Sequence, residues 1–230
     1  MLAIIGGSGL TQLANLSVIR REVVRTPYGE PSGALTFGQL CAQPVVFLAG
    51  HGYGHTIPPL RVHYQANLWA LREAGVSEII SVASVGGIRS DLCPGSLVVP
   101  DQIIDYTWGR KSTFHENSDE PVVHIDFTEP YDDGVRRRIL AAGVTAGQPI
   151  VDGAVYAATQ GPRLETAAEI NRLERDGADL VGMTGMPEAA LARELSIPYA
   201  AINVVANFAA GRASSEHEIC FDSIDAVLRE

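Results

Sequence analysis

The stretch Gly161-Pro162-Arg163-Leu164-Glu165-Thr166-Ala167-Ala168-Glu169 decides the fold, together with Gly182-Met183-Thr184-Gly185-Met186-Pro187-Glu188 shortly after it. The Gly-Pro pair ends a strand-like run at 155–159, and Thr166 with Glu169 forms a capping box that predicts a helix over 167–175. In the second segment an apolar run at 180–182 ends, and Pro187 suits the first position of a helix over 188–195. Each segment is therefore a strand-to-helix corner, the place where an α/β sheet binds polar ligands. Two ordinary corners without a ligand are the alternative.

The remaining apolar runs predict an alternation of strands and helices. We expect strands at 2–5, 45–49, 78–83, 96–100 and 199–206, a hairpin within 22–43, and helices at 62–74, 130–142 and 219–228. This order favours parallel strands covered on both faces by helices. No repeat or linker divides the chain, so we predict one domain over residues 1–230. It is a single-domain α/β fold whose mixed, mainly parallel, twisted sheet is flanked by helices.

The composition limits the partners and the compartment. The formal net charge is −10, which argues against nucleic acid and anionic membranes as partners, because both require a basic face. Cys41, Cys93 and Cys220 are far apart and odd in number, which suits a reducing cytoplasm and neither a disulfide framework nor a zinc site. No apolar run approaches membrane-spanning length, and the N-terminal run has no basic region before it. We therefore expect a cytoplasmic protein.

Polar residues and glycines recur where the predicted strands end. These positions are Ser8, His51, Ser84, Glu165, Thr184 and Asn207. Hydroxyls, an imidazole and glycine amides suit an anion, and one carboxylate and one carboxamide accompany them. These residues include no serine paired with a base, no group of metal ligands and no lysine suited to forming a Schiff base.

Two other interpretations of these loops are disfavoured. His51 and His55 have the spacing of helical metal ligands, but their loop is too rich in glycine and proline to be a helix. The loop at Gly6-Gly7-Ser8-Gly9 follows a strand, but Gln12 stands where a dinucleotide-binding fingerprint needs glycine.

Longer motifs carry a resemblance to a known family. They are Ile-Gly-Gly-Ser-Gly-Leu at 5–10, Gly-His-Gly-Tyr-Gly-His-Thr-Ile-Pro-Pro at 50–59, Tyr-Gln-Ala-Asn-Leu-Trp-Ala-Leu at 64–71, and the two corner segments. The chain resembles the trimeric nucleoside phosphorylase family, and within it the 5′-methylthioadenosine phosphorylases, over about residues 1–228. The resemblance implies a homotrimer that needs no metal or organic cofactor and uses inorganic phosphate as a cosubstrate.

The resemblance also assigns roles to residues. Ser8, His51, Thr184 and the Ser84 amide match phosphate-binding positions, and Met183 matches the residue under the ribose. Phosphate would attack C1′ as the purine leaves, a reaction that depends on positioning and on stabilising the charge that moves onto the base. Of the phosphate ligands, His51 is also expected to act in catalysis.

Base selectivity follows from the next set of matched positions. Adenine-selective relatives have aspartates where this chain has Asn207 and Ala209. The Asn207 carboxamide can donate to a 6-oxo group and N7, and Glu165 can accept from N1–H, with Leu164 beside the base. A buried mismatched acceptor is costly, so we expect a 6-oxopurine, hypoxanthine, with Asn207 and Glu165 as catalytic residues.

The expected 5′ pocket is apolar and suits a methylthio group. Phe221 and Ile224 match residues of the pocket lid, and His124 matches a position contributed by the neighbouring subunit. The alternative is that Phe221 and Ile224 form a simple core stripe.

Three departures from the family pattern stand out. Gly50 replaces an arginine that anchors phosphate, and Ala83 replaces a hydroxyl or amide residue. Losing a guanidinium removes a charge-assisted contact, for which Arg61 is a substitute by sequence proximity only. The chain stops at Glu230, where family members continue through a longer helix.

These features predict a phosphorylase that acts on 5′-methylthioinosine. The alternatives, in order, are a general 6-oxopurine nucleoside phosphorylase, a 5′-methylthioadenosine phosphorylase, and a purine nucleoside binder without turnover. The last would follow from the loss of the arginine at position 50.

Overall fold

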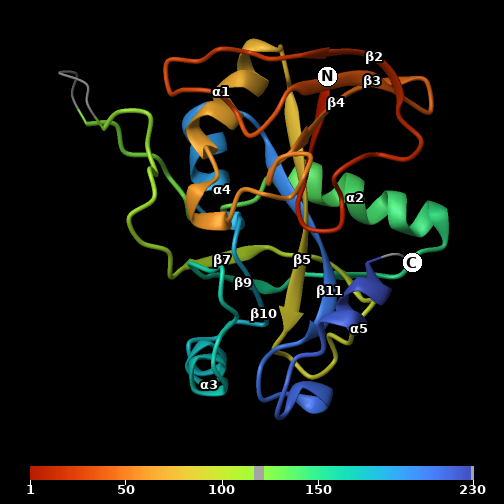
Figure 1. The fold of residues 1–230 in the computed structure, drawn as a ribbon, viewed down its shortest axis with the longest axis vertical. Coiled ribbons are helices and arrows are strands. Elements are labelled where there is room, and N and C mark those ends of the chain that lie inside the picture. Colours follow the sequence, from red (N-terminus) through yellow and green to blue (C-terminus); the bar gives the residue numbers. More distant parts are fainter. Residues whose placement is uncertain (117–121, 229–230) are drawn as a thin grey trace.

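A computed structural model of the chain describes residues 1–116 and 122–228 (Figure 1). The strands are β1 Leu2–Gly6, β2 Ser17–Glu22, β3 Leu35–Leu40, β4 Gln43–Ala49, β5 Glu78–Gly87, β6 Leu97–Val99, β7 Gln102–Asp105, β8 Ile150–Asp152, β9 Val155–Ala158, β10 Leu180–Gly182 and β11 Tyr199–Phe208. The helices are α1 Tyr64–Glu73, α2 Asp133–Ala146, α3 Ala167–Arg175, α4 Gly185–Glu194 and α5 Phe221–Val227, with short 3-10 turns at Pro59–Arg61 and Ala213–Ser215.

The strands of the described residues form one mixed sheet in the order β2-β3-β4-β1-β5-β10-β9-β7, and β11, β6 and β8 branch from β5. The centre is parallel, because β1 pairs with β4 and β5, and β5 pairs with β11. The β2-β3-β4 edge is antiparallel, as is the pair between β10 and β5. The expected mixed, mainly parallel α/β sheet is therefore confirmed.

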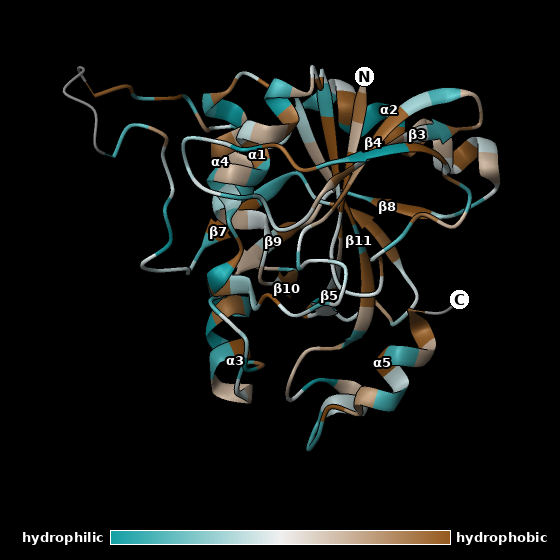
Figure 2. Cartoon of the chain, turned by 45° about the horizontal axis from the view of Figure 1, so that its top comes forward, coloured by the Kyte–Doolittle hydropathy of each residue, from teal (hydrophilic) through white to brown (hydrophobic). Residues whose placement is uncertain are grey.

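Helices cover both faces of the central strands. Figure 1 shows α1 and α4 together on one side of β5 and β11, with α2 and α5 on the other. Leu68 and Leu71 of α1 and Leu191 of α4 are fully buried in the main core. Figure 2 shows the hydrophobic residues concentrated in the strands and on the inward sides of these helices. None of the helices in the described part of the chain combines the length and apolar character needed to cross a membrane.

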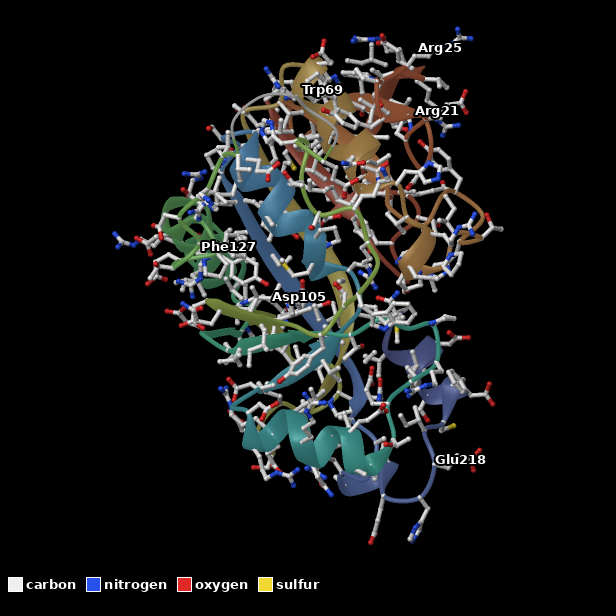
Figure 3. The ribbon with its side chains drawn as sticks, turned by 90° about the vertical axis from the view of Figure 1, so that its left-hand side faces the viewer. Arg21, Arg25, Trp69, Asp105, Phe127 and Glu218 are labelled. Atoms are coloured by element: carbon white, nitrogen blue, oxygen red, sulfur yellow. The ribbon has the colours of Figure 1, made fainter. Side chains whose placement is uncertain are left out.

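The edge strand β2 is exposed along its whole length. Its Arg20 lies over the ring of Phe37, 3.8 Å from the centroid, and pairs with Glu22. Figure 3 shows Arg21 and Arg25 projecting from this end of the molecule, with Glu218 near the opposite end. Charged side chains along an edge strand disfavour pairing with another sheet.

The local predictions around the two corner segments hold. Helix α3 begins and ends where expected, and Thr166 and Glu169 form both hydrogen bonds of the capping box. Strand β10 has the expected bounds, whereas α4 begins at Gly185, ahead of the expected start, with Met186 in a non-helical conformation.

Three predictions for other segments need correction. The expected hairpin within 22–43 is wrong, because β2 lies before it and pairs with β3 across a long connection. Strands β7 and β8 were not expected, because each is a short segment held by pairing with a strand distant in sequence, β9 and β6 respectively. Strand β5 continues to Gly87 through the expected glycine corner, because pairing with β11 and β10 holds the backbone extended there.

Candidate functional site

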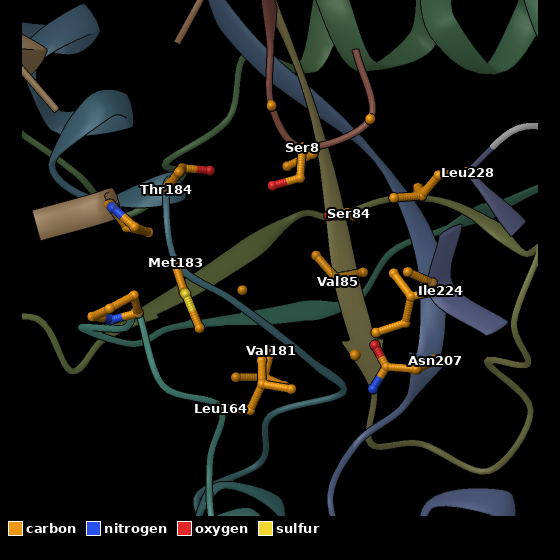
Figure 4. A pocket seen from close by; sticks show the side chains of 18 of the residues that line it. Ser8, Ser84, Val85, Leu164, Val181, Met183, Thr184, Asn207, Ile224 and Leu228 are labelled. Carbon is orange, nitrogen blue, oxygen red and sulfur yellow. The ribbon is translucent and has the colours of Figure 1, made fainter. Parts of the chain in front are cut away.

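One pocket of about 800 Å³ opens where the strands β1, β4, β5 and β11 end at their carboxyl ends. Every site residue expected from the sequence lines it except His124. They are Ser8, His51, Ser84, Leu164, Glu165, Met183, Thr184, Asn207, Ala209, Phe221 and Ile224. Figure 4 shows the Ser8 and Thr184 hydroxyls at one end of the pocket and Asn207 beside Ile224 at another.

The hydroxyl end of the pocket is built around two stacked histidines. The rings of His51 and His55 lie 4.7 Å apart between centroids. His51 is 5% exposed, and its Nδ1 lies 2.8 Å from the carbonyl oxygen of Ile57. A carbonyl can only accept, so Nδ1 carries the proton and Nε2 of the neutral ring is an acceptor. Burial, and to a lesser degree His55 and Arg110, lower the pKa of His51, which keeps the ring neutral at pH 7.

The expectation that no serine pairs with a base is wrong. Ser8 Oγ lies 2.7 Å from Nε2 of His55. The sequence did not show this contact because 47 residues separate the two side chains. His55 is exposed and has a positive φ of 50°, and both its ring, stacked on His51, and Ser8 line the pocket.

A carboxylate and a carboxamide occupy the other end. Glu165 Oε1 accepts from the Thr159 hydroxyl at 2.7 Å, which leaves its second oxygen for a ligand. Asn207 Nδ2 donates to the Phe208 carbonyl at 2.6 Å. One N–H and Oδ1 of Asn207 remain for a ligand. Donation to both O6 and N7 of a purine, as expected from the sequence, therefore requires release of Phe208.

Met183 lies between these two ends, on the strand-to-helix corner after β10. Its position depends on Gly161 of the other corner segment, which has a φ of 62°. A Cβ at Gly161 would lie 2.4 Å from the Met183 sulfur. A side chain at this position would therefore displace Met183 and strain a backbone conformation that glycine adopts easily.

Arg110 links the two corner segments through hydrogen bonds to their main chain, a role that was not predicted from the sequence. Its guanidinium donates to the carbonyl oxygens of Met183 and Met186 at 2.7 and 2.6 Å, and to those of Thr159 and Gln160 at 3.2 and 2.9 Å. It also contacts the Tyr64 hydroxyl at 3.2 Å. An arginine in an irregular polar segment carries no motif that would reveal this role.

Helix α5 closes one side of the pocket. None of its residues is buried, and Phe221 is 66% exposed, so the alternative of a core stripe is wrong. Ile224 and Leu228 extend the same apolar wall (Figure 4). Leu228, which the sequence analysis missed, packs on the loop after β1, because a Cβ at Gly9 would lie 3.1 Å from its Cδ1.

His124 is exposed and lies outside the pocket of its own chain. It belongs to the irregular arm that projects from the body between β7 and α2 (Figure 1). The base of the arm is anchored, because Phe114 packs against Tyr28 and Trp69 with ring centroids 5.0 and 5.7 Å away. Trp69 lies toward the same end of the molecule as Arg21 and Arg25 (Figure 3).

No lysine or arginine is among the described residues that line the pocket. Gly50 and Ala83 stand where the family pattern has polar anchors, and Arg61 is exposed at the end of a 3-10 turn and does not line the pocket. The suggestion that Arg61 replaces the missing arginine is therefore not supported by its position.

Glu188 lies beneath the hydroxyl end and is fully buried. Tyr199 donates to its Oε1 at 2.8 Å. Burial raises the pKa of Glu188 to about 7, and the hydrogen bonds from Tyr199 and Ser81 oppose this rise.

The pocket has room for a nucleoside between the hydroxyls at one end and Glu165 and Asn207 at the other. Comparisons with known proteins point to a family that fits this site. Residues 1–230 match the family described as the phosphorylase superfamily, and the chain belongs to that family.

Several individual proteins of this family are similar to the chain over most of its length. The chain is 50% identical over 228 residues to a probable S-methyl-5′-thioinosine phosphorylase of Pseudomonas syringae pv. tomato, covering 99% of this chain and 92% of the relative. It is 44% identical to a 6-oxopurine nucleoside phosphorylase of Pyrococcus furiosus, covering 94% and 82% of the two chains. Among solved structures, a methylthioadenosine phosphorylase from Schistosoma mansoni in complex with adenine superposes with a TM-score of 0.93 at 33% identity, covering 99% and 85%.

Proposed function

We propose that this chain cleaves 5′-methylthioinosine with inorganic phosphate, releasing hypoxanthine and 5-methylthioribose 1-phosphate for purine salvage. The observation that carries the substrate assignment is that Glu165 and Asn207 both line the same pocket, each with a polar atom left for a ligand. Relatives named as probable S-methyl-5′-thioinosine phosphorylases, at 50% and 52% identity, support it.

The base end favours a 6-oxopurine. The free oxygen of Glu165 can accept from N1–H, which hypoxanthine has and adenine lacks. The remaining N–H of Asn207 can donate to O6 or N7. Ala209, which is 2% exposed, offers a methyl group where a second carboxylate would favour a 6-amino group.

Catalysis in this proposal is positioning plus charge stabilisation. Phosphate binds among Ser8, His51, Thr184 and the Ser84 amide and attacks C1′ of the nucleoside. Met183 supports the ribose from below. The C1′–N9 bond breaks, and its electron pair moves to the purine, where a hydrogen bond from Asn207 stabilises the charge. No metal or organic cofactor takes part.

The apolar wall of α5 suits a 5′-methylthio group. Phe221, Ile224 and Leu228 place hydrocarbon at this side of the pocket, beside the carboxylate of Asp225, and favour contact with an apolar 5′ group. A general 6-oxopurine phosphorylase remains the second candidate, because the base end alone also fits inosine and guanosine. Relatives such as the Pyrococcus furiosus enzyme bear that name.

We further propose that the enzyme is a cytoplasmic homotrimer in which His124 contributes to the 5′ pocket of the neighbouring subunit. The arm that carries His124 exposes Trp108, Val122 and Val123, which are 72%, 78% and 53% exposed. Apolar side chains this accessible on a projecting segment suit a subunit contact.

The test compares phosphorolysis of 5′-methylthioinosine and inosine by following free hypoxanthine. We expect kcat/KM for 5′-methylthioinosine to be at least about tenfold higher than that for inosine, because one small apolar group in an apolar pocket changes kcat/KM by about this factor. Ile224→Ser should reduce that preference, whereas Ala226→Ser, on the exposed side of the same helix, should not. A preference for inosine would assign the chain to the second candidate.

A further inference from the structure

Asn203 carries a buried polar group for which the fold provides no partner. It lies in the middle of β11 and is fully buried. Neither Nδ2 nor Oδ1 of its carboxamide has a hydrogen-bond partner among residues 1–116 and 122–228. Buried carboxamides are almost always hydrogen-bonded, because an unpaired polar group in the interior costs free energy. The carboxamide therefore needs a partner that the described residues do not supply.

The side chains around Asn203 on its face of the sheet are apolar. Ala83 of β5 and Val98 of β6 lie beside it in register, and Figure 1 shows β5 and β11 side by side. Ala201 and Val205 are the next residues on the same face of β11. All four neighbours are buried, and none has a side-chain donor or acceptor.

Ala83 connects Asn203 to the main pocket. It lines the pocket beside Ser84, and the loop that carries Ser8 lies against it, because a Cβ at Gly7 would be 3.5 Å from the Ala83 Cβ. Residues in register on neighbouring strands point to the same face, and the strands are about 4.8 Å apart. An asparagine side chain is long enough to bring its carboxamide over the methyl group of such a neighbour. The Asn203 carboxamide is therefore within reach of the pocket between Ser8 and Ser84.

This part of the pocket has few donors for an anion. Gly50 and Ala83 offer no side-chain donor, and no lysine or arginine lines the pocket among the described residues. The guanidinium of Arg110 is directed to main-chain carbonyl oxygens. An anion at this place depends on neutral donors, so one additional N–H group has a measurable effect on its affinity.

We propose that Asn203 is a phosphate-binding residue of this site, whose carboxamide turns over Ala83 and donates an N–H of Nδ2 to a phosphate oxygen. The inference rests on the proposed function, which places inorganic phosphate near Ser8 and the Ser84 amide. Oδ1 can accept from the P–O–H group of hydrogen phosphate, so both unpaired atoms gain a partner. The small side chain of Ala83 keeps the route between the carboxamide and the pocket open.

This geometry makes positions 83 and 203 exchangeable. An asparagine at 83 would offer its carboxamide to the pocket from β5, while an alanine at 203 would leave room for it. Restored function in the double variant Ala83→Asn/Asn203→Ala is a readout that a merely structural role of Asn203 would not produce.

The test titrates the full chain, dialysed free of phosphate, with inorganic phosphate by calorimetry. Asn203→Ala should raise Kd for phosphate about tenfold or more, the usual effect of one hydrogen bond to a charged group. Tyr131→Phe is the matched control, because the Tyr131 hydroxyl is also buried without a partner but does not line the main pocket. Its Kd should equal that of the wild type, and the double variant Ala83→Asn/Asn203→Ala should recover most of the wild-type affinity. KM for phosphate during turnover of 5′-methylthioinosine should follow the same order.

The outcomes distinguish this inference from the proposed function. An unchanged Kd and KM for phosphate in Asn203→Ala would overturn the inference, as would a loss that the folded double variant does not recover. Where the double variant does not fold, Asn203→Ala and Tyr131→Phe decide: a rise in Kd confined to the first supports the inference, and equal values overturn it. A wild-type chain that binds phosphate without cleaving 5′-methylthioinosine would overturn the proposed function, and the titration would still decide the role of Asn203.

Discussion

Replacing Asn207 by aspartate changes one N–H donor into a carboxylate oxygen at the base end of the pocket. In the structure Asn207 donates to the Phe208 carbonyl at 2.6 Å, and an aspartate oxygen would be repelled from that carbonyl. The carboxylate should therefore turn toward the ligand. A 6-oxopurine then faces an acceptor where it needs a donor, which costs about 1–3 kcal/mol, or roughly 5- to 150-fold in kcat/KM.

The assay measures kcat/KM of Asn207→Asp for 5′-methylthioinosine and 5′-methylthioadenosine side by side at saturating phosphate. The first should fall by the stated factor and the second should rise, because the new acceptor can bind a 6-amino group. Asn207→Leu is the control, and it should lower turnover of 5′-methylthioinosine without raising that of 5′-methylthioadenosine. An unchanged ratio of the two substrates in Asn207→Asp would refute the assignment of base recognition to this side chain.

Three further predictions concern stability, measured by urea unfolding. Arg110→Ala should lower the free energy of unfolding by about 3 kcal/mol or more, because several carbonyl oxygens lose a charged donor; a loss below 1 kcal/mol would contradict its bridging role. The contribution of Glu188 to the free energy of unfolding, taken as the difference between wild type and Glu188→Gln, should fall by roughly 3 kcal/mol between about pH 4.5 and pH 7, because burial raises the pKa of Glu188 from 4.5 to about 7 and deprotonation then opposes folding. Parallel pH profiles of the free energy of unfolding in wild type and Glu188→Gln would contradict the assignment of this effect to Glu188. Thr166→Ala should cost about 1 kcal/mol through loss of the helix cap, and no change would show that the cap contributes nothing.

The sequence predicts best those elements whose signals are local. The capping box at Thr166 and Glu169 sets the start of α3, and the compact apolar runs give β4 and β10 closely. It predicts poorly those elements that exist through pairing with distant strands. Strand β8 is only three residues long and is held by β6, and β5 extends through its glycines because β11 and β10 lie beside it.

The site shows the same contrast between residues with local sequence signals and residues whose roles depend on distant segments. Ser8, His51 and Glu165 follow strands and Asn207 lies at the carboxyl end of β11, so the rule that ligands bind at the carboxyl ends of parallel strands brings them into one pocket. Arg110 could not be found in this way, because its role depends on carbonyl groups from two distant corners. The contact between Ser8 and His55 likewise arises only when the loops after β1 and β4 lie together, and the tautomer of His51 depends on how its own loop brings the Ile57 carbonyl to the ring.

The most direct test of the central claim is the ratio of kcat/KM for 5′-methylthioinosine to that for 5′-methylthioadenosine in the wild-type enzyme with phosphate. Glu165 and Asn207 together predict a ratio of roughly 100 or more, because a site built to hydrogen-bond one set of groups rejects an analogue that leaves them unpaired. Hypoxanthine should then be the main base released. Release of adenine at an equal or greater rate would contradict the account.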